Sequence, residues 1–436
     1  MHDPHDRSAA PSTSTPATRA RPVLQAAPHT RAFDSSLALL NEGYRFMPRR
    51  FEELGSDIFA TRIMLRRVLC MRGAEAARLF YASDRFTRSK AIPPTVLTLL
   101  QDFGSAEMLD GAAHRQRKAL MLSLLGAYDN ARLTALAADL WRARFAEWRQ
   151  RGRVVLLREA ESVLAEAACR WAGIALAPEA LRLRTEEFAA MVDGAGSFGP
   201  RNLRAQLLRR RSERWARDLV DAVRSGRITA DPGSALAVIA RHRDHDGQAL
   251  DTRTAAVELI NLLRPTLAVA RFVVFGALAL HQCPAWRARL ASGDDAELTM
   301  FAQEVRRFYP FFPGVGGRAS GDFTWHGMRF AKGDWVLLDL YGTNHHPALW
   351  PRPESFDPER FASWRDDGHS LVAQGAGDYL TGHRCPGEMA TVALMKSALH
   401  LLAAEASYQV PAQDLTIDMA RMPTMPRSGL VLDVTG

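Results

Sequence analysis

Cysteine is scarce in this chain of 436 residues and follows no pattern of disulfides or zinc ligands. The four cysteines are about 100 residues apart, and no two of them form a CxxC pair. A disulfide-rich secreted protein and a zinc-ribbon protein are therefore excluded. Because free cysteines are typical of reducing compartments, we expect the protein to work in the cytoplasm.

Long apolar segments are also missing. The longest run, Leu267 to Leu280, has 14 residues and is interrupted by Arg271, whereas a helix needs about 20 apolar residues to cross a bilayer. The N-terminus lacks the apolar stretch of a secretory signal and is rich in Pro, Ser, Thr and Ala. We therefore expect no integral membrane span, and we predict a disordered extension over residues 1–32 ahead of one domain over residues 33–436.

Lysine is nearly absent, since 52 of the 56 basic side chains are arginine and the net charge is +8. A basic protein of this kind could bind a polyanion or a membrane surface. The arginines, however, are scattered through the chain and are not concentrated in one basic segment. We therefore expect no nucleic-acid partner.

Helical patterns dominate what is present, and 47% apolar residues are enough for a large core. Strand-like segments are short and lie toward the two ends of the chain, at residues 60–72, 323–330 and 335–341. The sequence therefore predicts a fold that is mainly α with a small β part. The predicted helices cover residues 130–149, 155–173, 202–224, 252–281, 294–308 and 388–404.

Residues 254–280 are apolar nearly all round, which is typical of a helix through the centre of a domain. Pro265 lies in the middle of this segment; it has no N–H and should free the carbonyl of Asn261 and kink the helix. Arg264 precedes it, and a cation in an apolar helix needs an anionic partner. Glu258 is six residues earlier and poorly placed on the same helix, although another segment could supply a partner.

A cysteine stands just before the last predicted helix, in the segment Gly382-His383-Arg384-Cys385-Pro386-Gly387-Glu388. Proline suits a first helical turn, so Cys385 should lie next to free N–H groups at a helix N-terminus. These groups and the helix dipole favour a thiolate, which is a soft metal ligand. Most single cysteines in turns are inert, so the interpretation of Cys385 depends on the motifs around it.

Those motifs are an ExxR pair, Glu304 and Arg307, then Pro358-Glu359-Arg360-Phe361, and then the Cys385 segment. In this order they resemble the cytochrome P450 superfamily of haem-thiolate enzymes, over essentially residues 33–436. The resemblance implies the cytochrome P450 fold, with a long central helix over haem b. It makes Cys385 the axial ligand of the iron, and it makes Glu304, Arg307 and Arg360 a structural charge network.

The same resemblance extends to basic side chains that meet the haem propionates. His114, Arg117 and Lys118 match the helix that supplies these cations, and Arg318 and Arg384 match it less closely. The alternative for each cation is a solvated helix face.

Two departures from ordinary P450 monooxygenases indicate a branch. Arg264-Pro265 replaces the acid–alcohol pair of the central helix, and Asp378 and Thr381 replace the usual Phe and Gly before the cysteine. Both departures, and residues 304–313 and 337–347, resemble the bacterial fatty-acid peroxygenases. The resemblance implies that Arg264 binds the carboxylate of a long-chain fatty acid, which then serves as the acid–base group in H2O2-dependent α or β hydroxylation. Pro265 would position Arg264, and no redox partner would be needed.

Glu107 occupies a position that approaches the haem in this family, where Gln is usual in hydroxylating members and His in members that form terminal alkenes. The loop before Asp110 is about two residues shorter than in relatives. A carboxylate would repel the substrate carboxylate unless it were protonated or turned away, in which case Met108 would face the haem. Because histidine is missing, we expect hydroxylation with little formation of 1-alkenes.

Three other functions remain open at this point. One is a reductase-dependent P450 monooxygenase, and a second is an isomerase or dehydratase of lipid hydroperoxides. The third is a non-catalytic sensor of haem or fatty acid.

Overall fold

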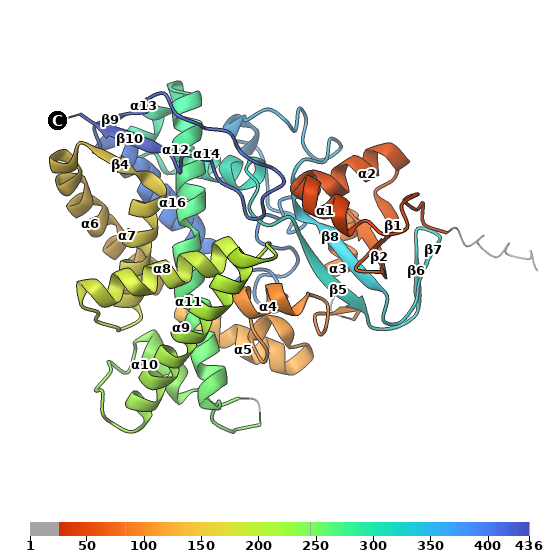
Figure 1. Cartoon of the computed structure of the whole chain (residues 1–436), viewed down its shortest axis with the longest axis horizontal. Coiled ribbons are helices and arrows are strands. Elements are labelled where there is room, and N and C mark those ends of the chain that lie inside the picture. The colour runs from red at the N-terminus through yellow and green to blue at the C-terminus, as the bar shows by residue number, and fades with distance from the viewer. Residues whose placement is uncertain (1–25, 83, 245, 436) are drawn as a thin grey trace, which may run out of the picture.

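The structure is a computed structural model and describes residues 26–82, 84–244 and 246–435. Most described residues are helical, which confirms the predicted fold class. Helices α6–α9 and the largest sheet with α1 and α2 lie on different sides of the molecule (Figure 1), whereas the small strands β4, β9 and β10 lie on the helical side. The helices are α1 (Ser36–Glu42), α2 (Phe46–Leu54), α3 (Ala74–Tyr81), α4 (Pro94–Leu100), α5 (Gly111–Leu124), α6 (Ala127–Arg151), α7 (Leu156–Trp171), α8 (Pro178–Gly194), α9 (Pro200–Arg224), α10 (Ala235–Arg241), α11 (Thr252–Ala268), α12 (Ala270–Gln282), α13 (Ala285–Ala291), α14 (Asp295–Phe308), α15 (Leu340–Asn344) and α16 (Glu388–Ala404), with short 3-10 turns η1 (Gly43–Arg45), η2 (Ala106–Met108) and η3 (Pro358–Phe361).

The largest sheet has the strand order β1-β2-β8-β5-β3, in which β2 and β8 are parallel and the other neighbours are antiparallel. A second sheet has the order β4-β10-β9, and β6 pairs with β7 in a hairpin. The strands are β1 (Ile58–Ile63), β2 (Arg66–Met71), β3 (Phe86–Thr87), β4 (Arg153–Val155), β5 (Gly314–Ala319), β6 (Phe323–Trp325), β7 (Met328–Phe330), β8 (Trp335–Asp339), β9 (Tyr408–Gln409) and β10 (Val431–Val434).

Strand β5 is not evident in the sequence because its first four residues include three glycines. The structure gives the reason, since a Cβ at Gly316 would collide with the carbonyl oxygen of Ala91. A Cβ at Gly317 would lie 2.9 Å from the ring of Phe80. Close approach of neighbouring atoms, and not a turn, therefore explains the glycines of this strand.

The predicted central helix of residues 252–281 is present and is divided shortly after Pro265, the residue at which the sequence predicts a kink. Helix α11 ends at Ala268 and α12 begins at Ala270. The division follows Pro265 by one turn, and the amide of Val269 donates to the carbonyl of Thr266, an i to i−3 bond of 3.3 Å. Val269 keeps helical torsion angles, so α12 follows α11 through the helical part (Figure 1).

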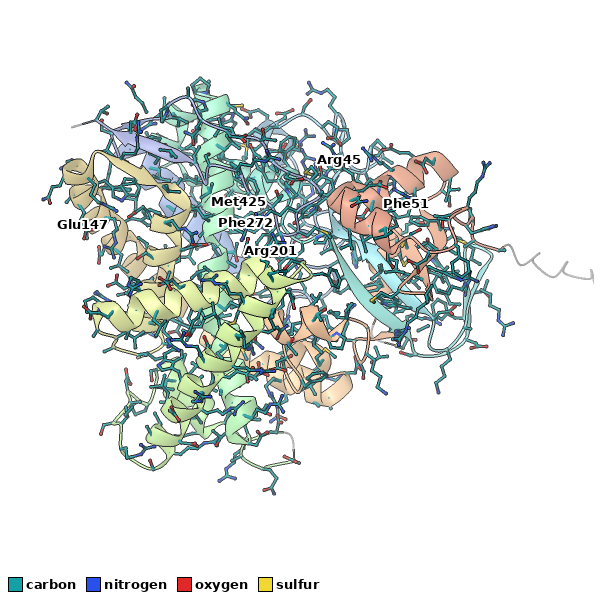
Figure 2. The ribbon with its side chains drawn as sticks, in the orientation of Figure 1. Arg45, Phe51, Glu147, Arg201, Phe272 and Met425 are labelled. Carbon is teal, nitrogen blue, oxygen red and sulfur yellow. The ribbon has the colours of Figure 1, made fainter. Side chains whose placement is uncertain are left out.

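Within the described residues, one helical stretch, Thr252–Gln282, is long and apolar enough to cross a membrane. Its most apolar window is 89% buried inside the protein, as expected for a core helix. Phe272 of α12 and Met425 of the C-terminal segment both belong to the main hydrophobic core (Figure 2). Phe51 of α2 belongs to a separate core beside β1 and β2.

The structure describes part of the predicted N-terminal extension. Residues 1–25 lie outside the described residues. The amide of Ala60 donates to the carbonyl of Pro28 at 2.7 Å, and the amide of Thr30 donates to the carbonyl of Ala60 at 3.1 Å. Residues 28–30 thus pair with β1, which corrects the expected boundary at residue 32. All four cysteines are free thiols, as the sequence predicts.

Candidate functional site

Cys385 lies in the loop before α16, and its amide donates to the carbonyl of Gln374 at 3.1 Å. The Nε2 of Gln374 lies 3.7 Å from the sulfur. Burial, assisted by the charge of Glu388, raises the pKa of the Cys385 thiol to about 11, although Lys118 and the Gly387 amide act in the opposite direction. A bound metal ion would lower this pKa and hold the sulfur as a thiolate.

The predicted charge network of Glu304, Arg307 and Arg360 is present and buried. Arg307 donates to both carboxylate oxygens of Glu304, at 2.6 and 2.7 Å, and to the carbonyl of Asn344 at 3.0 Å. Arg360 lies 3.2 Å from the same carboxylate. The amide of Asp357 donates to Glu304 Oε1 at 2.7 Å. The network joins α14 to the η3 segment and acts as a structural clamp, as expected.

Arg384, which is predicted to meet a propionate, pairs with two carboxylates in the structure. Its guanidinium donates to Glu388 Oε2 at 2.6 Å and to Asp366 at 2.6 Å. Arg306 of α14 also contacts Glu388, at 2.5 Å. Arg384 is thus neutralised by two carboxylates, and these ion pairs attach the Cys385 loop to α16 and α14.

Arg117 also pairs with two carboxylates. Its side chain is buried and pairs with Glu258 of α11 at 2.7 Å and with Asp244 at 2.5 Å. The amide of Ala106 donates to the same oxygen of Glu258 at 2.9 Å. Burial and the nearby Glu107 raise the pKa of Glu258 to about 7, although Arg117 lowers it. Arg117 therefore joins α5 to the central helix.

His114 and Lys118 lie on the same face of α5 as Arg117 and point toward the Cys385 loop. The ammonium of Lys118 donates to the carbonyl of Gly382 at 3.0 Å and to that of Arg384. The rings of His114 and His383 stack with centroids 3.8 Å apart. Burial, together with the nearby charges of His383 and Lys118, lowers the pKa of His114 to about 3.

Arg318 forms no ion pair in the part of the chain that the structure describes; it donates to the carbonyls of Lys90 and Gly333. Sequence reasoning missed Arg88, a buried cation that donates to the carbonyl of Gly316 at 3.2 Å. The Arg88 guanidinium lies over the ring of Phe80 at 4.3 Å. Arg88 follows strand β3 outside any motif, so the sequence contains no signal for it.

Arg264 lies on α11 and is only 5% exposed. Its Nη2 donates to the carbonyl of Leu100 and to Asn261 Oδ1 at 3.4 Å, while its Nε has no acceptor among the described residues. No carboxylate in the described chain lies within ion-pair distance of it, and Glu258 is taken by Arg117. Burial lowers the pKa of Arg264 to about 9, with Glu107 and Cys385 acting to raise it.

Glu107 lies in η2, next to the Ala106 amide that bonds Glu258. Its Oε2 is buried and has no hydrogen-bond donor in the described chain. The carboxylate of Glu107 acts on the pKa values of Arg264, Lys118 and Cys385. Its charge therefore lies close enough to act on both α11 and the Cys385 loop.

These residues fit a haem thiolate centre. Cys385 is a buried sulfur ligand on a loop fixed by ion pairs. Arg88, Lys118 and Arg318 are cations that lack carboxylate partners in the described chain and could neutralise propionates. Unpartnered polar atoms of Arg264 and Glu107 face the same region. No group of three or more metal-ligating side chains occurs among the described residues.

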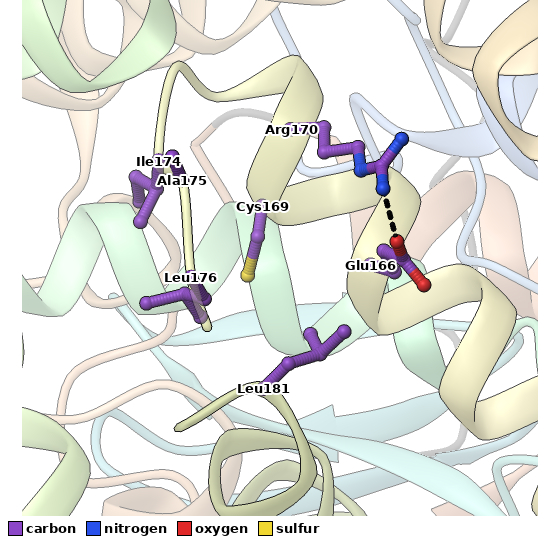
Figure 3. Close-up of a pocket in the computed structure, with 7 residues that line it drawn as sticks. All are labelled: Glu166, Cys169, Arg170, Ile174, Ala175, Leu176 and Leu181. Atoms are coloured by element: carbon purple, nitrogen blue, oxygen red, sulfur yellow. Dashed lines mark hydrogen bonds and ion pairs between the residues drawn. The ribbon is translucent and has the colours of Figure 1, made fainter. Parts of the chain in front are cut away.

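A cavity of about 290 Å³ lies elsewhere, against α7 and the start of α8 (Figure 3). The ion pair between Arg170 and Glu166, 2.5 Å, lines it together with Cys169. Burial raises the pKa of the Cys169 thiol to about 12, so this sulfur stays protonated. The cavity shares no residue with the Cys385 region and offers no reactive group.

Comparisons with known proteins agree with this geometry. Residues 297–413 match the family described as Cytochrome P450. Cytochrome P450 4A7 of Oryctolagus cuniculus is 46% identical over 65 residues, which span 15% of this chain and only 13% of that relative. Cytochrome P450 4A11 of Homo sapiens is 48% identical over a segment of the same length.

The solved structures match almost the whole chain. Cytochrome P450SP alpha (CYP152B1) with (R)-ibuprophen is 43% identical, with 92% of this chain and 98% of that chain covered and a TM-score of 0.89. Cytochrome P450EX alpha (CYP152N1) with myristic acid is 39% identical, with 94% and 98% covered and a TM-score of 0.90. An OleT variant with arachidonic acid is 33% identical, with the same coverage and a TM-score of 0.91. This chain therefore belongs to the cytochrome P450 superfamily, in the branch of the fatty-acid peroxygenases.

Proposed function

We propose that this protein is a peroxygenase that uses H2O2 to hydroxylate long-chain fatty acids at the α or β carbon. The observation that carries the proposal is the environment of Arg264. A buried guanidinium without a carboxylate partner in the described chain is costly, and the carboxylate of a fatty acid supplies the missing anion. Two solved relatives hold myristic and arachidonic acid, which supports this class of substrate.

Arg264 binds and orients the substrate. Its Nη2 is held by the carbonyl of Leu100 and by Asn261, whose own side chain donates to the carbonyl of Gln101 at 3.0 Å. The guanidinium is thereby fixed between α11 and the loop after α4. Pro265 is a positioning residue, because a proline inside α11 fixes its own backbone angle directly after Arg264. A fixed cation anchors the carboxylate end of the fatty acid, so the carbons next to the carboxylate are the ones held in place for reaction.

Haem, held by Cys385, supplies when bound the iron at which the O–O bond of the peroxide breaks. The central helix has no acid–alcohol pair to move the required proton. The substrate carboxylate on Arg264 takes this role: it accepts a proton from one peroxide oxygen and returns it to the other. The substrate thus completes the catalytic machinery, and H2O2 supplies both the oxygen atom and the oxidising equivalents without a reductase.

Glu107 affects how tightly this site binds the carboxylate of the fatty acid. Its carboxylate carries a buried oxygen without a donor in the described chain and acts electrostatically on Arg264, so it and a substrate carboxylate bound at Arg264 repel one another. Glu107 therefore weakens fatty-acid binding. A carboxylate at this position, in place of histidine, supports hydroxylation as the main reaction and 1-alkene formation as the minor one.

The remaining assignments complete the proposal. One catalytic domain, which includes residues 28–30 through their pairing with β1, works in the cytoplasm. Lys118, Arg88 and Arg318 neutralise the haem propionates. The main competing function is a monooxygenase that takes electrons from a reductase. An isomerase or dehydratase of lipid hydroperoxides and a non-catalytic sensor of haem or fatty acid compete with it less strongly.

One experiment separates these functions. The purified holoprotein is incubated with saturated fatty acids of several chain lengths and H2O2 as the only oxidant, and the products are identified by mass spectrometry. The proposal predicts 2-hydroxy and 3-hydroxy acids. Turnover that requires NADPH and redox partners would establish the monooxygenase. Conversion of a lipid hydroperoxide alone would establish the isomerase, and binding without any product would establish the sensor.

A further inference from the structure

Five large apolar side chains are exposed around α1 and the turn between β1 and β2, and we call this group the α1 patch. Phe33 and Leu37 are each 74% exposed and Leu65 is 68% exposed, with Leu40 and Met64 also exposed. Leu37 and Leu40 lie three residues apart on the outer face of α1, whose inner residues Ala38 and Leu39 pack on the core. Contiguous apolar side chains of this kind mark an interaction surface.

The turn that presents Met64 and Leu65 is held in an unfavourable conformation. Both residues have positive φ angles, 51° and 60°, which cost free energy for side chains other than glycine. Two hydrogen bonds hold the turn: Ser36 Oγ accepts from the Met64 amide at 2.7 Å, and Asp34 Oδ2 accepts from the Leu65 amide at 2.6 Å. These bonds thus hold the side chains of Met64 and Leu65 exposed to solvent. Apolar side chains are ordinarily buried in the core instead.

Arginines surround the α1 patch. Arg31, Arg62 and Arg66 are exposed and form no ion pair in the portion of the chain described. Arg62 lies over the ring of Phe33 at 5.2 Å and faces Asp34, whose carboxylate is occupied by backbone amides. The patch therefore combines apolar side chains with an excess of positive charge at its edge.

We infer that the α1 patch docks on the surface of an anionic lipid bilayer. Apolar side chains enter the boundary between headgroups and acyl chains, while arginines bind the phosphates. Two other occupants fit less well. In a symmetric dimer the arginines of the two copies would face each other, which is unfavourable. Residues 1–25 include only Met1, Val23 and Leu24 as large aliphatic side chains, too few to cover five.

The inference stands apart from the proposed function, although the two are compatible. Fatty acids accumulate in bilayers, so docking would bring the enzyme to its substrate without a membrane-spanning helix. The location of the patch agrees with this role, because α1, β1 and β2 lie at one end of the molecule (Figure 1). Vesicle binding is measured without peroxide, so it can fail or succeed independently of the peroxygenase reaction.

Flotation of the full-length holoprotein with vesicles tests the inference. Vesicles of phosphatidylcholine alone are compared with vesicles that also contain phosphatidylglycerol. The wild type should float with the anionic vesicles only. The double variant Leu37→Ser with Leu65→Ser, and the double variant Arg62→Gln with Arg66→Gln, should each lower the partition coefficient by about tenfold or more. The control Tyr128→Ser, which removes a largely exposed aromatic ring from α6, should bind as the wild type does.

Each other outcome overturns the inference. Equal binding by the wild type and both double variants would show that the α1 patch is not involved, and so would a complete lack of binding. A wild-type dimer in light scattering that Leu65→Ser converts to a monomer would identify a second copy as the occupant. Binding that appears only after deletion of residues 1–25 would identify that segment as the occupant. Thermal denaturation midpoints should be the same in the wild type and all these variants, which shows that they are folded.

Discussion

Arg117 of α5 and Glu258 of α11 form an ion pair of 2.7 Å in the interior, where Glu258 has no measurable exposure. The same carboxylate oxygen accepts the Ala106 amide, so the pair also fixes the loop that carries Glu107. The central helix and this loop supply Arg264 and Glu107, the two charged groups proposed to meet the substrate. The ion pair therefore acts on the site through position, although neither of its members is proposed to touch the substrate.

Replacement of Glu258 by glutamine should change how stability depends on pH. The pKa of Glu258 is raised to about 7 in the folded protein, so between its ordinary value and 7 the folded state binds more protons than the unfolded state. The contribution of Glu258 to stability is therefore lost as the pH rises through 7. Relative to Glu258→Gln, the free energy of unfolding of the wild type should fall by on the order of 2 kcal/mol between pH 5 and pH 8.

Urea denaturation at several pH values measures this difference. Asp339, whose pKa burial also raises to about 7, contributes equally to both proteins and cancels in the comparison. Parallel stability profiles for the wild type and the variant would contradict the assignment.

Glu304→Gln should destabilise the protein by about 3 kcal/mol or more, because two buried guanidinium groups then lack their carboxylate. The matched control is Glu359→Gln, in the neighbouring η3 turn, where an exposed carboxylate pairs with Arg289 at the surface. That change should cost less than about 1 kcal/mol. Denaturation midpoints and the fraction of protein that retains haem provide the measurement, and similar values for the two variants would show that the network is not a structural clamp.

Glu107→Gln should tighten fatty-acid binding. The change removes a buried negative charge beside Arg264 and keeps nearly the same shape. We expect the dissociation constant of myristate to fall by about fivefold to tenfold, or roughly 1 kcal/mol. Calorimetric titration of the holoprotein measures this constant, and Met108→Leu, a neutral change at the adjacent residue, serves as the control. Weaker binding by Glu107→Gln would mean that this carboxylate assists the substrate.

Cys385→Ser should abolish the thiolate signature in the spectrum of the reduced protein with carbon monoxide. Serine at this position lacks the soft sulfur that ligates the iron. Cys283→Ser, which changes a half-buried free thiol at the end of α12, should leave that spectrum unchanged. The same loss of the signature in both variants would exclude Cys385 as the specific ligand.

Much of the helical part was predictable from the sequence because apolar periodicity is strong where helices bury one face. Helices α6, α7, α9, α14 and α16 begin and end within about four residues of their predicted bounds. Short helices such as α10 and α13 show too few turns for a period to be recognised. Strand β5 was hidden because close packing against Ala91 and Phe80 selects glycine, which is otherwise typical of turns.

The candidate-site residues that belong to sequence motifs could be predicted from the sequence. The ion-pair partners of the other charged residues were harder to predict. Cys385, the Glu304 network and Arg264 lie where the motifs indicate. Arg117 and Arg384 were expected at propionates, but each meets two carboxylates instead. Such pairing depends on tertiary packing, and no spacing within one segment reveals it. Arg88 was missed for the same reason.

The most direct test of the central claim is peroxygenation by Arg264→Leu. The account predicts that kcat/KM for myristic acid with H2O2 falls at least about a hundredfold, because both carboxylate binding and proton transfer depend on this guanidinium. Arg271→Leu removes another buried arginine of the same helical stretch, one that contacts Asp193 and the carbonyl of Thr424, and should keep most activity if folded. An unchanged spectrum of the reduced protein with carbon monoxide shows that each variant retains its haem centre. Full peroxygenation by Arg264→Leu would contradict the account.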